Sequence, residues 1–217
     1  RVAELPHDPT LRAALMRHLV TFTVVAMGLV ATTAPASEPG CVERVSVKGE
    51  VRLDQAFGVR RIDQAGALDA RTAFRLASVS KQFTAAAVLT LVQEGRLSLD
   101  DRLRKVLPEL PAYTDEISIR HLLTHTSGLP DYEALMDAEA ADGGIAYTPI
   151  RQIDDAAVIK LLARTPSPRF AAGTRWAYSN SGYVVLGVVV ARVSGQSLER
   201  YLREKVFQPN GLLSTQL

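Results

Sequence analysis

The sequence predicts an α+β protein in which helices outnumber strands, and three segments support this. Val45–Val47 and Val51–Phe57 flank a Lys-Gly pair, which is typical of an antiparallel β-hairpin with a tight turn. Ser80–Glu94 consists of good helix formers with an apolar stripe along one face. Tyr183–Val193 is apolar on every side, as expected of a buried helix. We therefore expect a helical region accompanied by a partial antiparallel sheet.

Caps and helix breakers place the elements between the hairpin and the middle of the chain. A loop should follow the hairpin as far as about Arg71. Gly95 is a plausible end for the helix that begins at Ser80. Asp100 or Asp101 could cap a short helix that ends before Pro108.

The second half of the chain shows the same kinds of signal. Ile119–His125 predicts another short helix, and Asp154–Arg164 predicts a longer one. Between them, Asp131–Tyr147 is small, acidic and contains glycine, so we expect an exposed excursion. Ser197 should cap a last helix that runs to about Phe207.

Composition limits the classes of protein to consider. The 217 residues, 47% of them hydrophobic, suit one domain with a real core. Lysine and arginine number 25 against 23 acidic residues, and no block of like charge stands out, so a nucleic-acid partner is not expected. The single cysteine, Cys41, cannot form an internal disulfide or a cysteine-rich metal site. No glycine-rich phosphate loop is present, and the sequence predicts no cofactor.

The N-terminal segment has the layout of a secretory signal peptide. Leu19–Val30 is a short apolar run preceded by Arg17, and Ala34-Pro35-Ala36 is placed as a cleavage site. A retained membrane helix is the alternative, but spanning a bilayer takes about 20 apolar residues, more than this run offers. We expect residues 1–15 to be upstream of a start at Met16, and residues 1–36 to be removed. The domain at 37–217 is then exported to the periplasm or medium, without a stable membrane anchor.

Ser78 and Lys81 form the first candidate site. A spacing of three residues at the start of a helix puts the hydroxyl and the ammonium on one face, within reach of each other. A serine hydroxyl becomes a nucleophile when a neighbouring base takes its proton, and helix N-terminal N–H groups favour a developing oxyanion. Taken alone, the pair is equally explained by a Ser78 that caps the helix and a solvated Lys81.

Tyr178 and Asn180 form the second candidate pair. Two residues apart on an extended segment, they point to the same side. A phenol near a lysine can carry a proton, and a carboxamide can hold both an ammonium and a substrate carbonyl. The structural alternative is a core tyrosine followed by an asparagine that caps the next helix.

His121 and His125 share a helical face at a spacing seen in metal sites. However, Leu122 occupies the position of the glutamate expected after the first histidine, and no third ligand is evident. We therefore expect these histidines to be structural and predict no metal.

Together these segments resemble the serine β-lactamase and penicillin-binding protein superfamily, in particular its branch of class C β-lactamases, D-alanyl-D-alanine carboxypeptidases and esterases. The resemblance covers most of the chain after residue 45. It rests on four ordered blocks and a shorter one: FRLASVSKQF at 74–83, GRLSLDD at 95–101, IRHLLTHTSGLP at 119–130, GTRWAYSNSGY at 173–183 and FQPNG at 207–211.

The resemblance implies a β-lactamase/transpeptidase-like fold and a covalent mechanism. Ser78 would attack an amide, β-lactam or ester carbonyl of a small-molecule or peptidoglycan-like substrate, and its backbone N–H would be one oxyanion donor. Lys81 and Tyr178 would share the general-base work, which is disputed across this superfamily. Asn180 would position the substrate and Lys81, and water would release the acyl group.

The sequence also departs from the family pattern. The third family box, a lysine or histidine followed by glycine on a sheet strand, is not found in the 37 residues after Asn180 (217 − 180 = 37). The family's long N-terminal helix has no room between Ala36 and Val45. We therefore expect a C-terminally truncated member that lacks most of its sheet strands and has low or no activity. A non-catalytic fragment or pseudoenzyme that at most binds peptidoglycan-like or β-lactam ligands is the alternative function.

Overall fold

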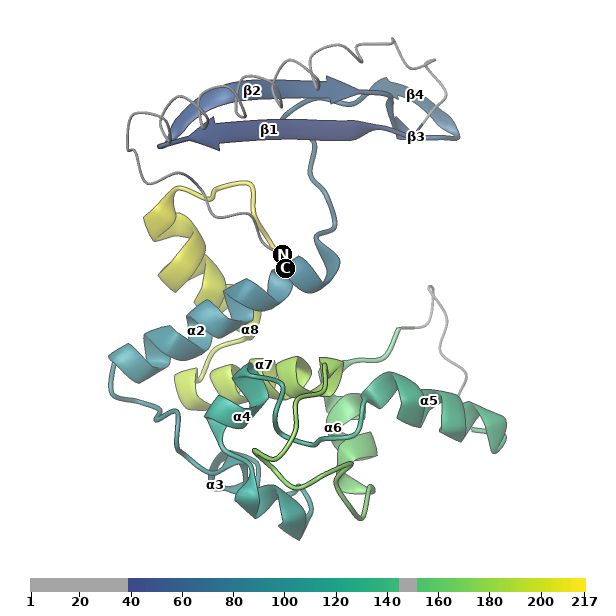
Figure 1. Ribbon diagram of the computed structural model, residues 1–217, viewed down its shortest axis with the longest axis vertical. Helices are drawn as coiled ribbons and strands as arrows, with labels where there is room; N and C mark the ends of the chain where they lie inside the picture. The colour runs from purple at the N-terminus through teal and green to yellow at the C-terminus, as the bar shows by residue number, and fades with distance from the viewer. Residues whose placement is uncertain (1–38, 145–151) are drawn as a thin grey trace, which may run out of the picture. The chain divides into compact units, whose positions relative to one another are not determined.

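The computed structural model describes residues 39–144 and 152–217, so the predicted signal peptide lies outside the described residues. The chain divides into two compact units, residues 1–74 and residues 75–217 (Figure 1). All the candidate site residues belong to the second unit.

The described part of the first unit begins with the predicted hairpin. Strand β1 (Cys41–Val47) pairs antiparallel with β2 (Glu50–Phe57), and Val45 lies opposite Leu53. At the turn, Lys48 and Gly49 have φ of 53° and 84°. Tight hairpin turns that match strand twist need such positive φ values at both central residues, so the Lys-Gly turn is confirmed.

A second hairpin follows where the sequence predicted a loop. Strand β3 (Val59–Arg61) pairs antiparallel with β4 (Gln64–Ala67). These strands are too short and too polar to show an alternating pattern, which is why the prediction of a loop to Arg71 was wrong. An exposed ion pair of 2.9 Å joins Arg60 of β3 to Asp69, which follows β4.

The second unit is helical. Its residues 77–80 form a 3₁₀ turn, η1 (Ala77–Ser80), which leads directly into α2. A π-helical turn, η3 (Arg203–Phe207), continues α8. The helices are α2 (Lys81–Gln93), α3 (Leu103–Val106), α4 (Ile119–Leu123), α5 (Tyr132–Ala141), α6 (Asp155–Ala163), α7 (Asn180–Ser194) and α8 (Leu198–Leu202). With the two small antiparallel sheets of the first unit, the described residues confirm the α+β prediction.

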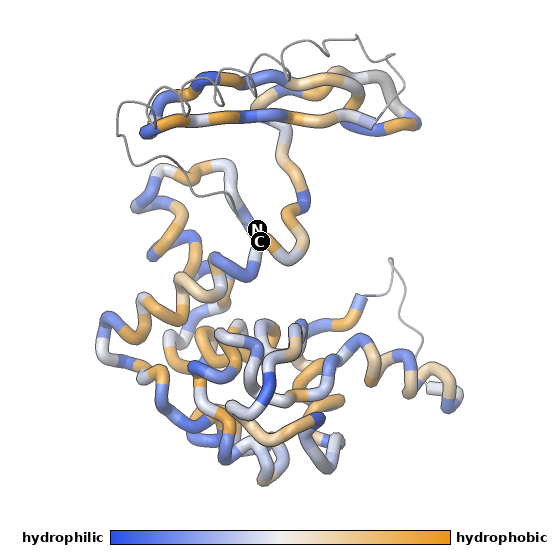
Figure 2. Tube along the Cα trace, viewed as in Figure 1, coloured by the Kyte–Doolittle hydropathy of each residue, from blue (hydrophilic) through white to orange (hydrophobic). Residues whose placement is uncertain are grey.

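Helix α7 is the centre of the helical unit. It contacts α2, α4, α6 and α8, and its apolar residues stand out in Figure 2. Four of its side chains are fully buried: Val185, Leu186, Val189 and Val190. Full burial of such a side chain stabilises the fold by about 1.5–3 kcal/mol. The all-round apolar pattern of Tyr183–Val193 therefore predicted the central helix correctly.

One local prediction in this unit was wrong, and another needs a structural detail added. Neither Asp100 nor Asp101 caps α3, whose N-cap is Arg102 with no side-chain cap. The Asp101 carboxylate instead accepts from the Ser98 N–H and pairs with Lys105. The described part of the expected excursion, residues 131–144, has no buried residue, as predicted, and residues 145–147 lie outside the described residues. The segment also contains α5, at whose start the Asp131 side chain accepts the Glu133 N–H.

A loop after α4 supports the segment that carries Tyr178. Gly128 has a φ of +73°, and a Cβ there would lie 2.1 Å from the Phe170 carbonyl oxygen. Only glycine allows that approach, in which Gly128 accepts the Arg169 N–H at 2.8 Å. Further along, the Gly173 N–H donates to the Thr126 carbonyl oxygen at 2.8 Å. These backbone bonds fix the course of residues 169–178 over α4.

Among the described residues, no single helix is long and apolar enough to cross a bilayer. A pair that joins Asn180–Ser194 to Leu198–Asn210 across a bend of 76° meets the length and composition criteria together.

Candidate active site

Ser78 lies in η1, immediately before α2. The preceding residue, Ala77, has a φ of 45°, a left-handed conformation that is uncommon for alanine. Ser78 is exposed, and it is not the N-cap of η1 or of α2. The alternative in which Ser78 only caps a helix is therefore wrong.

Lys81 connects two of the predicted site residues. Its Nζ donates to Ser78 Oγ at 3.1 Å and to Asn180 Oδ1 at 2.9 Å. The second contact joins residues 99 positions apart in sequence. Lys81 Nζ also lies 4.9 Å from the centroid of the Tyr178 ring. Lys81 is partly buried and held by specific acceptors, so the alternative of a solvated lysine is also wrong.

Tyr178 reaches Ser78 from the loop before α7. Its hydroxyl donates to Ser78 Oγ at 2.7 Å. The residue is 42% exposed, so it is not the core tyrosine of the structural alternative. The Lys81 ammonium, as a hydrogen-bond donor, lowers the pKa of the Tyr178 phenol below its ordinary value of 10.0, and the Ser78 hydroxyl lowers it further.

Asn180 is the first residue of α7, not its cap. The N-cap is Ser179, whose Oγ accepts the Gly182 N–H at 3.2 Å. This frees the Asn180 carboxamide to accept from Lys81. The backbone N–H of Asn180 donates to the Asp131 carboxylate at 2.8 Å, which ties the start of α7 to the start of α5. All four predicted site residues thus come together around the Ser78 hydroxyl and the Lys81 ammonium.

The hydrogen bonds and the position of Lys81 bear on the ionisation of Tyr178. Lys81 Nζ donates two hydrogen bonds, to Ser78 Oγ and Asn180 Oδ1, which hold the group close to the Tyr178 ring. A cation at that position stabilises a phenolate at Tyr178, which is the form able to accept a proton from Ser78. The arrangement can therefore move a proton from a serine hydroxyl to a neighbouring oxygen.

Three residues near the site were not predicted to belong to it. Asp131 holds Asn180, the Tyr183 ring lies 5.7 Å from Lys81 Nζ, and the His125 ring lies 4.7 Å from the Tyr178 ring. The position of Asp131 just before a helix start was a usable capping signal. The contact of His125 with Tyr178 could not be predicted from the sequence. A helical pattern places His125 on the same face as His121, but α4 ends at Leu123 and His125 has a φ of 58°.

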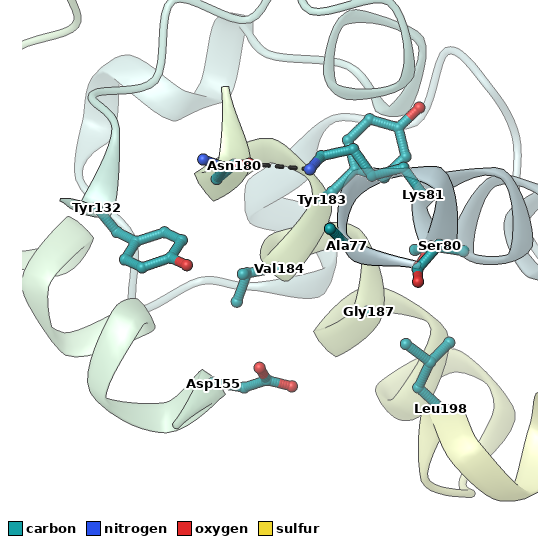
Figure 3. A pocket seen from close by; sticks show the side chains of 11 residues that line it. Ala77, Ser80, Lys81, Tyr132, Asp155, Asn180, Tyr183, Val184, Gly187 and Leu198 are labelled. Atoms are coloured by element: carbon teal, nitrogen blue, oxygen red, sulfur yellow. Dashed lines mark hydrogen bonds between the residues drawn. The ribbon is translucent and has the colours of Figure 1, made fainter. Parts of the chain in front are cut away.

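A pocket of about 240 Å³ opens beside Lys81 and Asn180. Figure 3 shows the Lys81–Asn180 hydrogen bond on one side, Asp155 on the other and Val184 between them. Burial and the nearby Asp154 carboxylate raise the pKa of Asp155. The other residues that line the pocket are Ala77, Ser80, Thr84, Tyr132, Tyr183, Gly187 and Leu198.

The described residues contain no group of three or more histidine, cysteine, aspartate or glutamate side chains arranged to hold a metal ion. His121 and His125 are engaged separately. His121 Nδ1 accepts the Ser118 N–H at 3.3 Å in a capping box at the start of α4, and His125 Nδ1 accepts the Ser179 N–H at 3.2 Å.

Comparison with known proteins identifies the context of this site. The family model described as Beta-lactamase matches residues 29–217. The chain is 33% identical over 169 residues to "Penicillin-binding protein 4*" of Bacillus subtilis, a match that covers 78% of this chain and 36% of the relative. It is 37% identical over 181 residues to "Esterase EstB" of Burkholderia gladioli, a match that covers 80% of this chain and 45% of the relative.

A solved structure shows the same fold. The octameric penicillin-binding protein homologue of Pyrococcus abyssi superposes with a TM-score of 0.67 at 30% identity, over 91% of this chain and 43% of that one. The β-lactamase/transpeptidase-like fold is therefore confirmed. The chain spans less than half the length of each of these three relatives.

Proposed function

The chain belongs to the β-lactamase family, and from this premise we propose that it is a serine hydrolase that forms an acyl-enzyme at Ser78. One observation carries the proposal: Ser78 Oγ accepts hydrogen bonds from both Lys81 Nζ and the Tyr178 hydroxyl, at 3.1 and 2.7 Å. A nucleophile in contact with a proton acceptor, which is in turn held by a third group, is the arrangement that covalent catalysis requires.

In the proposed reaction, the Tyr178 phenol, which donates to Ser78 Oγ in the structure, first loses its proton to water. The Ser78 hydroxyl then donates to the resulting phenolate, which takes the Ser78 proton. Ser78 Oγ forms a bond to the substrate carbonyl carbon, and the carbonyl oxygen becomes an oxyanion near the Ser78 N–H. The protonated Tyr178 then gives its proton to the leaving amine or alcohol as the bond from carbon to that group breaks. Water, deprotonated in the same way, attacks the acyl carbon and releases the acid, and Ser78 regains its proton.

Lys81 and Asn180 have supporting roles in this scheme. Lys81 keeps its charge throughout and stabilises the phenolate electrostatically. Asn180 fixes the ammonium through its Oδ1, and its amide nitrogen is available to a substrate carbonyl. The acyl substituent would enter the pocket beside these two residues.

The substrate is a molecule with an amide, β-lactam or ester carbonyl. Relatives named as a penicillin-binding protein and as an esterase support this range. A peptidoglycan-like peptide or a β-lactam suits the first name, and a small ester suits the second. The nucleophile and its partners would be the same for all three because each reaction is acyl transfer to a serine.

Covalent labelling tests the proposal. Because the sequence predicts low or no turnover for these 217 residues, the test measures a single acylation and not turnover. We expect a fluorophosphonate and a penicillin, given in excess and over a long incubation, each to add one equivalent to the folded chain, with the modified residue mapped to Ser78 by peptide mass spectrometry. Ser78→Ala serves as the blank, and neighbouring Ser80 serves as an internal comparison that should stay unmodified. A soluble, folded sample with no label on Ser78 would contradict the proposal and favour a non-catalytic protein that at most binds such ligands.

We also propose that the protein is exported, because of the apolar run Leu19–Val30 and the Ala34-Pro35-Ala36 sequence that follows it. N-terminal sequencing of the exported product should place the mature end near Ser37. An N-terminus before Met16 would overturn the assignment of a signal peptide.

A further inference from the structure

His125 follows α4 in a conformation that turns its side chain toward the reactive segment. Helix α4 ends with Thr124 as its C-cap, and the next residue, His125, has a φ of 58°. Positive φ is common just after a helix but is usually adopted there by glycine or asparagine. Here it directs an imidazole toward residues 176–179, away from the face that carries His121.

His125 holds the chain on both sides of Tyr178. Its carbonyl oxygen accepts the Ala177 N–H at 2.9 Å, and its Nδ1 accepts the Ser179 N–H at 3.2 Å. Its ring lies against the Tyr178 ring, with centroids 4.7 Å apart and planes inclined by 31°. Ser179 is only 3% exposed, so its N–H depends on a protein acceptor. His125 thus contacts three consecutive residues, with Tyr178 in the middle.

We propose that neutral His125 is a positioning residue for Tyr178, and that protonation of its Nδ1 disables the active site. The inference rests on the proposed serine hydrolase function and adds a means of regulating it. A protonated Nδ1 is itself a donor, so it could no longer accept the Ser179 N–H and this hydrogen bond would be lost. The segment that places the Tyr178 hydroxyl next to Ser78 would then lose its support. A small displacement of a catalytic group is enough to cause a large loss of rate.

The groups around His125 determine the pH at which its Nδ1 becomes protonated. It faces the Lys81 ammonium from α2, the Tyr178 phenol from the loop, and the Tyr183 ring of α7 at 5.2 Å, and His121 lies four residues earlier, within α4. Burial, followed by the charge of Lys81, lowers the pKa of His125 below 6.5. His125 is therefore neutral at pH 7, and the support of Tyr178 is lost as the pH falls through that lowered pKa.

The pH dependence of Ser78 labelling by a fluorophosphonate tests the inference on the full chain. Protonation of Tyr178 should give the logarithm of the rate a slope of one as pH falls, and protonation of His125 should add a second slope below pH 6.5. His125→Asn keeps an acceptor at the Nδ1 position, tolerates positive φ and does not titrate. We expect it to retain the first slope and lose the second.

Two further variants separate positioning from folding. His125→Phe keeps a ring but leaves the Ser179 N–H without its acceptor, so labelling should fall by about 10- to 100-fold at neutral pH, with no second slope. His121→Asn, the control at the neighbouring histidine within α4, should keep both slopes. A second slope that persists in His125→Asn, or disappears in His121→Asn, would overturn the inference.

Nuclear magnetic resonance gives a readout that does not need catalysis. At pH 7.5 the ¹⁵N shifts of His125 should show a bare Nδ1 and a protonated Nε2, and the Ser179 amide resonance should move with the titration of His125. A protonated Nδ1 at that pH, or a Ser179 amide indifferent to the titration, would refute the inference. If Ser78 is never labelled, the proposed hydrolase function fails, and these spectra still decide whether His125 controls the Tyr178 segment.

Discussion

Tyr178→Phe is expected to slow the acylation of Ser78 by about 10²- to 10⁴-fold, the range contributed by a positioned general base. The variant removes one oxygen, the one that lies 2.7 Å from Ser78 Oγ. It keeps the ring that lies against His125, and Tyr178 is 42% exposed, so the fold should not change. Stopped-flow or quenched labelling with a fluorophosphonate measures the rate, and circular dichroism checks the fold.

Tyr113→Phe provides the matched control. Among the described residues, the Tyr113 hydroxyl is buried without a hydrogen-bond partner, and burial raises its pKa. Removing that hydroxyl breaks no hydrogen bond of the described site and should leave labelling unchanged. Wild-type labelling in Tyr178→Phe would mean that Lys81, not Tyr178, accepts the serine proton.

The second large effect is expected for Lys81→Met, which removes the ammonium but keeps a side chain of similar length. Lys81 is the main reason that the pKa of Tyr178 is lowered, so its loss should return that pKa toward 10.0. Because only the phenolate can act as the base, the rate at pH 7 falls by about tenfold for each unit by which the pKa rises. The rate should recover partly at alkaline pH, where Tyr178 ionises without assistance.

Two measurements check this prediction. The pH profile of labelling should shift to higher pH, and the ultraviolet absorbance of tyrosinate should report the same shift for Tyr178. Lys105→Met is the control, since Lys105 is 70% exposed and pairs with Asp101 on the surface. An unchanged profile in Lys81→Met would show that the ammonium has no part in setting the ionisation of Tyr178.

Lys81→Met should also reduce stability slightly. Asn180 Oδ1 loses the donor at 2.9 Å, and an unsatisfied, partly buried acceptor costs about 1–3 kcal/mol. The urea midpoint should therefore fall, but the cooperative transition should remain. This cost is too small to unfold a typical domain, so the kinetic effect can be read on a folded protein.

Local sequence patterns predicted the elements that depend on nearest neighbours. The Lys-Gly turn at 48–49, the apolar helix at 183–193 and the Ser197 cap are all found. Patterns failed where the local signal was weak or was overlooked. The short hairpin at 59–67 has little hydrophobic alternation of its own, and α5 was not predicted although Asp131, a capping residue, precedes its first turn.

The sequence by itself determined the chemical inventory of the site: a serine and a lysine one turn apart, and a tyrosine and an asparagine two residues apart. Spacing within a helix fixes the first pair, since its geometry is local. Only the family resemblance, and no local pattern, led us to expect that the two pairs meet across about a hundred residues, and the tertiary structure shows that contact. The support of Tyr178 by His125 is visible in the tertiary structure alone. The physical reason is that backbone hydrogen bonds between the loop after α4 and residues 169–179 determine where Tyr178 lies. A sequence shows which donors and acceptors exist, but it does not show which of them pair.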